Sequence, residues 1–296
     1  MSAAPKLGVI AGGGELPARI VAACRAAGRE VFVLALKGQT APQTVTGVDH
    51  AWIKIGAVTK GLAHLRAAGV AEVVLAGPVR RPSLGSLTLD ARALKWLGKF
   101  GKAALGDDDL LSAIVRDLEA EEGFPVVAVE TILNDALAAE GVYGRHAPDD
   151  QARRDIDRGV EVARALGAVD VGQAVVVQDG YVLGVEAAEG TDRLIDRCAG
   201  LRREAPGGVL VKICKPGQER RADLPTIGRE TVARAAAAGL RGIAIEAGGS
   251  MLIDRDAVLR AADEAGLFVV GIAVPGPDAG LDVARRRKAG PRPADG

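Results

Sequence analysis

The chain has 296 residues, with 38 lysines and arginines against 38 aspartates and glutamates, and only 3% of its residues are aromatic. This length suits two domains of ordinary size, each able to bury its own core. Balanced charge gives no general attraction for nucleic acid or an acidic membrane, and so few aromatic residues argue against a base-stacking surface. We therefore exclude nucleic acid as a partner.

The cysteines and the N-terminus favour a cytoplasmic protein. Cys24, Cys198 and Cys214 lie far apart, which argues against a disulfide framework or a structural zinc site. The chain enters a short apolar strand directly after Lys6, without the core of a signal peptide. No stretch approaches the ~20 apolar residues that are needed to span a bilayer.

The first half of the chain alternates apolar runs with amphipathic segments. We expect strands at 7–11, 31–36 and 73–76, and helices at 15–27 and 60–68. This alternation is typical of a Rossmann-like domain with a mainly parallel sheet. Beyond it we expect helices at 86–105 and 106–122, and a buried strand at 124–129.

The second half predicts a mixed-sheet α/β domain. It opens with a charged helix at 149–166, and Asp179-Gly180 between two apolar runs indicates a tight β-hairpin. The polar segment at 141–150 has no apolar period and is expected to be a linker. We therefore expect two α/β domains, at 1–140 and 151–275, with the ligand cleft between them and a disordered tail at 276–296.

A glycine turn joins the first predicted strand to the first helix. It comprises Gly12, Gly13 and Gly14, followed by Glu15 and Leu16. Glycines let the backbone approach a phosphate, and the N–H groups at a helix start attract anions, so we expect substrate contact here. The alternative is a plain structural turn.

A second candidate turn follows the strand at 73–76. Gly77, Pro78 and Arg80 lie at the expected carboxyl end of the sheet, where an arginine can bind phosphate oxygens. The helix that follows is basic and amphipathic and carries Trp96, which is typical of a membrane-interface helix. An ordinary helix that packs on the core explains the same period.

Four carboxylates are candidate magnesium ligands. Asp108 belongs to an acidic run that alternatively caps a helix, whereas Glu186 and Glu246 each follow a predicted strand. Asp223 lies in a polar loop. Acids at strand ends can converge on one Mg²⁺, whereas the nearby Glu189 or Thr191 could simply cap the next helix.

The loop at about 215–228 carries the densest set of polar residues. Long polar loops are costly to order and are commonly functional. The substrate-binding candidates around this loop and at the next strand end are Lys212, Lys215, Gln218, Arg221, Thr226, Gly248 and Gly249. Cationic side chains here would neutralise a diphosphate, and Asp223 would bind Mg²⁺ or orient a water. The alternative is a solvated loop whose charges pair with one another.

Several short motifs resemble, in order, the UDP-2,3-diacylglucosamine pyrophosphatase family of lipid A biosynthesis, the type unrelated to calcineurin-like phosphoesterases. They include Gly12-Gly-Gly-Glu-Leu-Pro17, Gly77-Pro-Val-Arg-Arg-Pro-Ser83, Gly106-Asp-Asp-Asp-Leu-Leu111, Lys215-Pro-Gly-Gln218 and Arg221-Ala-Asp-Leu-Pro-Thr-Ile-Gly228. The resemblance covers nearly the whole chain except the tail.

The resemblance implies Mg²⁺-dependent hydrolysis of UDP-2,3-diacylglucosamine to UMP and 2,3-diacylglucosamine 1-phosphate (lipid X). It also implies that Asp223 is required for turnover and that the enzyme meets the inner membrane surface peripherally. A non-catalytic carrier of lipids or nucleotide sugars is an alternative. A nicotinamide-dependent oxidoreductase is another, although Lys37 stands where that class needs an acidic ribose ligand. Acyl chain length, the attacked phosphorus, the number of cations and a homodimer stay open.

Overall fold

The computed structural model describes residues 4–79, 89–100, 107–203 and 206–274, except the side chains of Leu97, Lys99, Phe100, Asp107 and Asp108. Its contacts divide the chain into two compact units. The N-unit comprises Met1–Asp135 and Gly217–Leu224, and the C-unit comprises Ala136–Pro216 and Pro225–Gly296. The expected tail lies outside the described residues.

The N-unit contains a four-stranded, fully parallel sheet in the order β3-β2-β1-β4. Its strands are β1 (Leu7–Ala11), β2 (Val31–Leu36), β3 (Asp49–Ile53) and β4 (Glu72–Ala76). This confirms the Rossmann-like prediction. The edge strand β3 was not predicted, because it starts with exposed polar residues and lacks a continuous apolar run.

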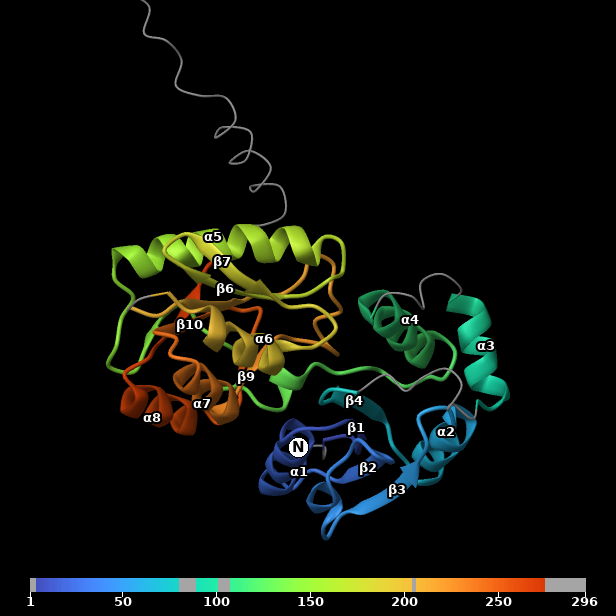
Figure 1. Ribbon diagram of the computed structural model, residues 1–296. Helices are drawn as coiled ribbons and strands as arrows, with labels where there is room; N and C mark the ends of the chain where they lie inside the picture. Colours follow the sequence, from blue (N-terminus) through green and yellow to red (C-terminus); the bar gives the residue numbers. More distant parts are fainter. Residues whose placement is uncertain (1–3, 80–88, 101–106, 204–205, 275–296) are drawn as a thin grey trace, which may run out of the picture. The chain divides into compact units, whose positions relative to one another are not determined.

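Helices cover both faces of this sheet (Figure 1). They are α1 (Leu16–Ala26), α2 (Val58–Ala67), α3 (Ala91–Phe100) and α4 (Asp107–Ala120), with a short 3-10 helix η1 (Pro42–Val45). Side chains of β2, such as Leu34, share one core cluster with Leu65 of α2 and Leu118 of α4.

The predicted strand at 124–129 is wrong. Only an isolated bridge between Val126 and Val73 forms there, and the chain enters the 3-10 helix η4 (Val129–Thr131). Pro125 has no N–H to give to a ladder, which limits the pairing to a few bonds. The segment still extends the sheet edge, since the N–H of Val73 donates to the carbonyl of Pro125 at 2.9 Å.

The C-unit contains a six-stranded mixed sheet in the order β5-β12-β10-β8-β6-β7. Its strands are β5 (Gly141–Tyr143), β6 (Ala174–Gln178), β7 (Tyr181–Val185), β8 (Val209–Lys212), β10 (Gly242–Glu246) and β12 (Phe268–Ile272). β8, β10 and β12 are parallel, whereas β5 and β6 run against their neighbours. Asp179 and Gly180, both with positive φ, form the predicted hairpin turn.

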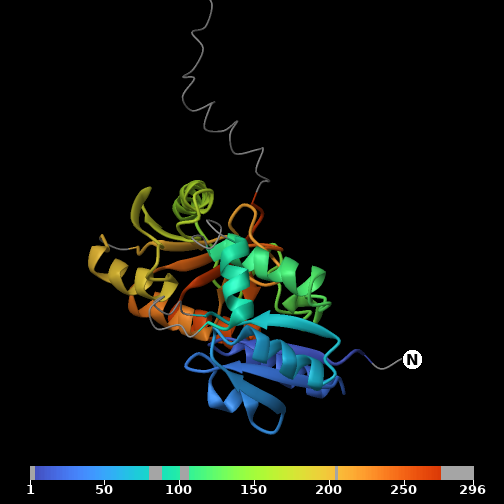
Figure 2. The same ribbon diagram turned by 90° about the vertical axis from the view of Figure 1, so that its right-hand side faces the viewer.

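In the C-unit, α5 (Asp150–Gly167) covers one face of the sheet, and α6 (Thr191–Cys198), α7 (Arg229–Ala237) and α8 (Arg255–Ala265) cover the other (Figures 1 and 2). Val175 of β6 packs in the cluster of α5, whereas its neighbour Val176 packs with Leu194 of α6. Gly159 lets α5 approach the sheet, because a Cβ there would collide with Val211. The η5 helix (Ala199–Leu201) and a small parallel pair, β9 (Thr226–Ile227) and β11 (Met251–Leu252), complete the C-unit.

Two expectations about domain organisation need correction. Residues 141–150 form part of the C-unit rather than a linker, because β5 pairs with β12 and Asp149 caps α5 by accepting a hydrogen bond from the Ala152 N–H. Residues 217–224, expected in the second domain, belong to the N-unit. Among the described residues, no helix has the length and apolar character required to cross a membrane.

Candidate active site in the N-unit

The two glycine turns predicted from the sequence contact each other at the carboxyl end of the parallel sheet. The N–H of Gly12 donates to the carbonyl of Ala76, and that of Gly13 donates to the carbonyl of Pro78, each at 2.8 Å. A Cβ on Gly12 would collide with the carbonyl of Gly77, which has a φ of +84°. These glycines are therefore needed for close packing of two turns.

The N–H groups of Gly12 and Gly13 already donate to carbonyl groups, so they are not available to an anion. Only the N–H groups of the residues that follow could bind one. The first N–H groups of a helix have no partner within the helix. At the start of α1, Glu15 provides no side-chain hydrogen bond as a cap, and Pro17 lies in the first turn. This end of α1 keeps the positive partial charge that favours a phosphate group.

An apolar cavity of about 410 Å³ opens at the same end of the N-unit. Its wall includes Leu34 and Leu75 from the sheet, Gly61 from α2, Trp96 from α3 and Ile114 from α4. Gly77 and Pro78 also line it. Among the described residues that line the cavity, Asp223 alone carries a charge. The site thus combines a large apolar volume with one carboxylate.

Asp223 lies in the loop Gly217–Leu224, which returns to the N-unit from the second half of the chain. The carbonyl of Glu219 accepts hydrogen bonds from the N–H groups of Ala222 and Asp223, at 3.1 and 2.9 Å. The side-chain amide of Gln218 donates to Oδ2 of Asp223 at 2.6 Å, and Gln218 is buried. Gln218, predicted to bind substrate, therefore orients the candidate catalytic carboxylate.

Arg221 contacts two carboxylates. Its Nε and Nη2 donate to Oε1 and Oε2 of Glu219 at 2.9 Å each, and its Nη1 donates to Oε1 of Glu119 at 2.7 Å. The hydrogen bond from Arg221 holds the pKa of the Glu219 carboxyl below its usual range, and the reciprocal bond to Glu219 raises the pKa of Arg221. These contacts indicate that Arg221 anchors the loop, in contrast to the predicted contact with substrate.

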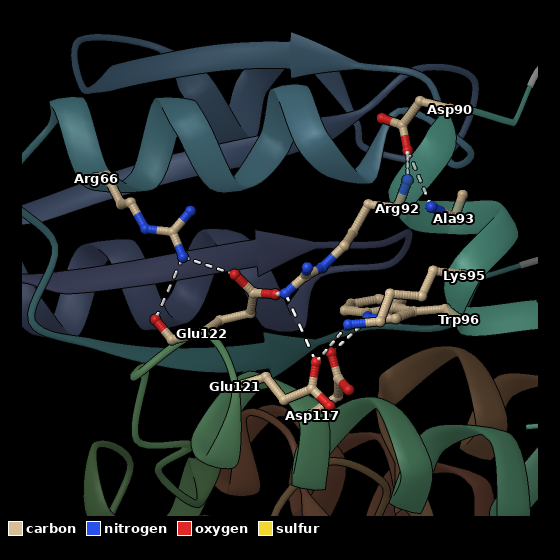
Figure 3. A network of polar contacts seen from close by, with 9 residues as sticks. All are labelled: Arg66, Asp90, Arg92, Ala93, Lys95, Trp96, Asp117, Glu121 and Glu122. Carbon is tan, nitrogen blue, oxygen red and sulfur yellow. Dashed lines mark hydrogen bonds and ion pairs between the residues drawn. The ribbon is translucent and has the colours of Figure 1, made fainter. Parts of the chain in front are cut away.

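Helix α3, which brings Trp96 to the cavity, is held by polar contacts with the end of α4 (Figure 3). The indole N–H of Trp96 donates to Asp117, which is buried. Arg92 pairs with Glu122, and Lys95 pairs with Glu121 at 3.0 Å. The cationic side of α3, interpreted from the sequence as a membrane-facing surface, is thus at least partly neutralised within the N-unit.

Asp90 caps the start of α3 and ties it to α2. Its carboxylate accepts from the N–H groups of Ala93 and Arg92, and from that of Thr59 in α2 at 2.7 Å. Burial alone would raise the pKa of Asp90, but these hydrogen bonds outweigh burial and keep it below its usual value. The first half of α3, which brings Trp96 to the cavity wall, is consequently tied to both α2 and the end of α4.

Apart from Arg80 and Asp108, the other predicted residues lie in the C-unit, several of them where parallel strands end. Glu186 follows β7 and accepts hydrogen bonds from the Gln173 N–H at 3.1 Å and the Thr191 hydroxyl at 2.6 Å. Glu246 ends β10 and accepts from the Cys214 N–H at 2.8 Å. Both carboxylates therefore organise loops of the C-unit.

The cationic candidates of the C-unit are also engaged. Lys212 is buried and donates to the carbonyl of Thr226 at 3.0 Å, and Lys215 pairs with Asp170 at 2.6 Å. Gly249 leaves room for the carboxylate of Glu246, because a Cβ there would lie about 2.5 Å from it. Gly248 has a φ of +65° and forms the same turn.

Within the part of the chain that the structure describes, no three His, Cys, Asp or Glu side chains gather where they could hold a metal. Mg²⁺ is commonly held by one or two carboxylates together with substrate phosphates, and Asp223 fits that arrangement. Glu186 and Glu246 already accept backbone or hydroxyl hydrogen bonds. The side chain of Asp108, and all of Arg80, lie outside the described residues.

Sequence reasoning missed the apolar cavity and Glu119. The cavity is made by side chains from several elements, and no local pattern distinguishes its wall from an ordinary core. One available signal was Gly61 inside the predicted helix at 60–68, since an interior glycine marks a close approach. Glu119 lies 102 residues before Arg221, so only the tertiary structure reveals the pair.

Comparison with known proteins adds a family assignment. Two solved structures have low similarity: a glycinamide-RNase-transformylase T from Mycobacterium tuberculosis (11% identity, 62% of this chain and 43% of that chain, TM-score 0.24), and the biotin carboxylase domain of 2-oxoglutarate carboxylase from Hydrogenobacter thermophilus (12%, 68% and 41%, TM-score 0.27). Neither carries an argument about this chain.

A curated sequence is far more similar. The UDP-2,3-diacylglucosamine pyrophosphatase LpxI of Caulobacter vibrioides is 44% identical over 276 residues, which cover 90% of this chain and 97% of that protein. The family model of the LpxI N-terminal domain matches residues 6–136, and that of the LpxI C-terminal domain matches residues 139–270. This chain therefore belongs to the LpxI family.

Proposed function

We propose that this protein hydrolyses the pyrophosphate bond of UDP-2,3-diacylglucosamine, giving UMP and 2,3-diacylglucosamine 1-phosphate in lipid A biosynthesis. The curated relative carries the name of this activity, and the match extends along both family domains. The reaction adds water across a phosphoric anhydride. The water oxygen bonds to one phosphorus, and the bridging oxygen leaves with the other phosphoryl group.

One observation carries the proposal: Asp223 lies in the wall of a large apolar cavity. A diacylated nucleotide sugar needs both features, because its acyl chains must leave water while its diphosphate needs polar groups nearby. Burying apolar surface stabilises the bound state by roughly 25 cal/mol per Å². The apolar cavity is suited to an acyl chain, and Asp223 is suited to act at the pyrophosphate bond.

The chain's own groups supply two parts of the chemistry. The start of α1, at Glu15 and Leu16, provides N–H groups and a positive partial charge for the diphosphate. Asp223, oriented by the Gln218 amide, would position the attacking water or hold a cation. A bound Mg²⁺ would stabilise the negative charge that develops on the phosphoryl oxygens.

Contact with the inner membrane surface is a further part of the proposal. The substrate carries two acyl chains and is expected in lipid, and none of the described helices can cross a membrane, so we expect the protein to reach its substrate from the membrane surface. Leu94, two positions before the cavity residue Trp96 in α3, is 55% exposed. We propose that this end of the N-unit contacts the membrane transiently from the cytoplasm.

The experiment that tests the proposal is UMP release. Purified protein is incubated with UDP-2,3-diacylglucosamine and Mg²⁺, with and without an excess of chelator, and UMP is quantified by chromatography. We expect many UMP molecules per protein molecule, and loss of this turnover with chelator. Bound but intact substrate would identify a carrier instead, and turnover that resists chelation would refute the role of Mg²⁺.

A further inference from the structure

One arginine between two glutamates fastens the loop that carries Asp223 to the N-unit. The side chain of Arg221 forms two hydrogen bonds with Glu219 in its own loop and one with Glu119 in α4, at 2.7–2.9 Å. We call Glu119, Glu219 and Arg221 the glutamate clamp. Glu119 lies 102 residues before Arg221 in the sequence, so the clamp ties the loop to helix α4.

We propose that Glu119 is a positioning residue: through Arg221 it holds the loop Gly217–Leu224 so that Asp223 stays in the wall of the apolar cavity. The proposal rests on the proposed function, in which Asp223 acts on the diphosphate. Glu119 itself does not line the cavity. Its contribution to turnover would therefore be indirect.

The loop needs such an anchor because of its place in the chain. Its neighbours on both sides, Pro216 and Pro225, belong to the C-unit, whereas the loop itself belongs to the N-unit. Hydrogen bonds within the loop, from Ala222 and Asp223 to the Glu219 carbonyl, fix its shape but not its position. The bond between Arg221 and Glu119, together with the packing of Ala222 against the N-unit core, fixes its position.

The geometry of Glu119 supports this role. Its Oε1 also accepts a hydrogen bond from the Val126 N–H at 3.3 Å, which orients the carboxylate toward Arg221. The Glu119 and Arg221 side chains are 35% and 38% exposed, and ion pairs with such exposure contribute little to global stability. Loss of the pair should disturb the loop without unfolding the N-unit.

The test replaces Glu119 and compares the result with a matched ion pair. The variants are Glu119→Ala and Glu119→Gln, and the control is Glu161→Ala, which removes an exposed pair of 2.8 Å with Arg158 in α5 of the C-unit. Misplacing a catalytic group by about 1 Å can cost ~100-fold in rate. We expect kcat to fall about 10- to 100-fold in Glu119→Ala and less in Glu119→Gln, with KM nearly unchanged. Glu119→Ala also removes the acceptor of the Val126 N–H, so its Tm should fall slightly, whereas Glu119→Gln keeps an oxygen for this bond and should keep its Tm. Glu161→Ala should keep the parent kcat.

Hydrogen–deuterium exchange gives a readout that needs no substrate. Peptides that cover 217–224 should exchange faster in Glu119→Ala than in the parent and in Glu161→Ala, while other N-unit peptides stay protected. A double-mutant cycle combines Glu119→Ala with Arg221→Ala. If Glu119 acts only through Arg221, the double variant should lose no more kcat and protection than Arg221→Ala alone.

Three results would overturn the proposal. They are parent-like kcat and exchange in Glu119→Ala, faster exchange throughout the N-unit, and a double variant whose losses equal the sum of those of the two single variants. Failure of the proposed function is recognised separately, because the parent itself would then release no UMP. Exchange would still decide whether the clamp orders the loop in that case.

Discussion

Replacement of Asp223 separates its chemical role from its structural one. In Asp223→Asn, the side-chain oxygen still accepts the hydrogen bond from Gln218, which is 2.6 Å long in the parent. In Asp223→Ala, the buried amide of Gln218 loses this acceptor, and an unsatisfied buried group costs about 1–3 kcal/mol. Only the alanine variant should therefore lose appreciable folding stability.

The effect on turnover should be large in both variants. Loss of a positioned carboxylate that assists proton transfer commonly costs 10²- to 10⁴-fold, which corresponds to about 3–5 kcal/mol of transition-state stabilisation. The apolar wall of the cavity is unchanged, so substrate affinity should stay within a few-fold of the parent. Asparagine isolates the loss of charge, because its size and its oxygen match those of aspartate.

The assay measures initial rates of UMP release at saturating substrate, together with Tm and the affinity of the inactive variant for intact substrate. We expect Asp223→Asn to bind substrate, to melt near the parent temperature and to turn over at least ~100-fold more slowly. If Asp223→Asn keeps kcat within tenfold of the parent, the role of Asp223 as the reacting-site carboxylate is refuted.

Two further predictions concern the cavity and the buried thiols. A Cβ on Gly61 would lie 2.9 Å from Ile53 Cδ1 and 3.1 Å from Leu34 Cδ2, so Gly61→Ala should push these side chains into the cavity. We expect kcat/KM across a series of acyl lengths to shift toward shorter chains, and an unchanged optimum would contradict the assignment of this cavity to an acyl chain. Burial raises the pKa values of Cys24 and Cys198, whereas the Cys214 side chain is partly exposed. At neutral pH a thiol reagent should therefore label Cys214 first and the other two only after unfolding, as mass spectrometry of labelled peptides would show.

Local patterns predicted much of the fold. The strands β1 and β2, and β4 after Glu72, are apolar runs because helices cover both faces of the sheet. The Asp179-Gly180 hairpin follows from residues that accept positive φ. The strand at 124–129 was overpredicted, since apolar composition alone does not reveal that Pro125 ends the regular pairing.

The candidate site was predicted less completely. Asp223 and Gln218 stand in one conspicuous polar loop, yet nothing in that loop says that it packs with the first half of the chain. Its anchor Glu119 is an ordinary helix residue in the sequence, and the clamp exists only after folding. The predicted convergence of Glu186 and Glu246 on a cation overlooked the backbone N–H groups that these carboxylates satisfy.

The central claim is that an acyl-binding cavity and Asp223 act on one substrate molecule. The most direct measurement compares UMP release from UDP-2,3-diacylglucosamine and from UDP-glucosamine, at equal concentrations with Mg²⁺. The account predicts rapid cleavage of the diacylated substrate and negligible cleavage of the sugar nucleotide without acyl chains. Equal rates on the two compounds, or no UMP from either, would contradict it.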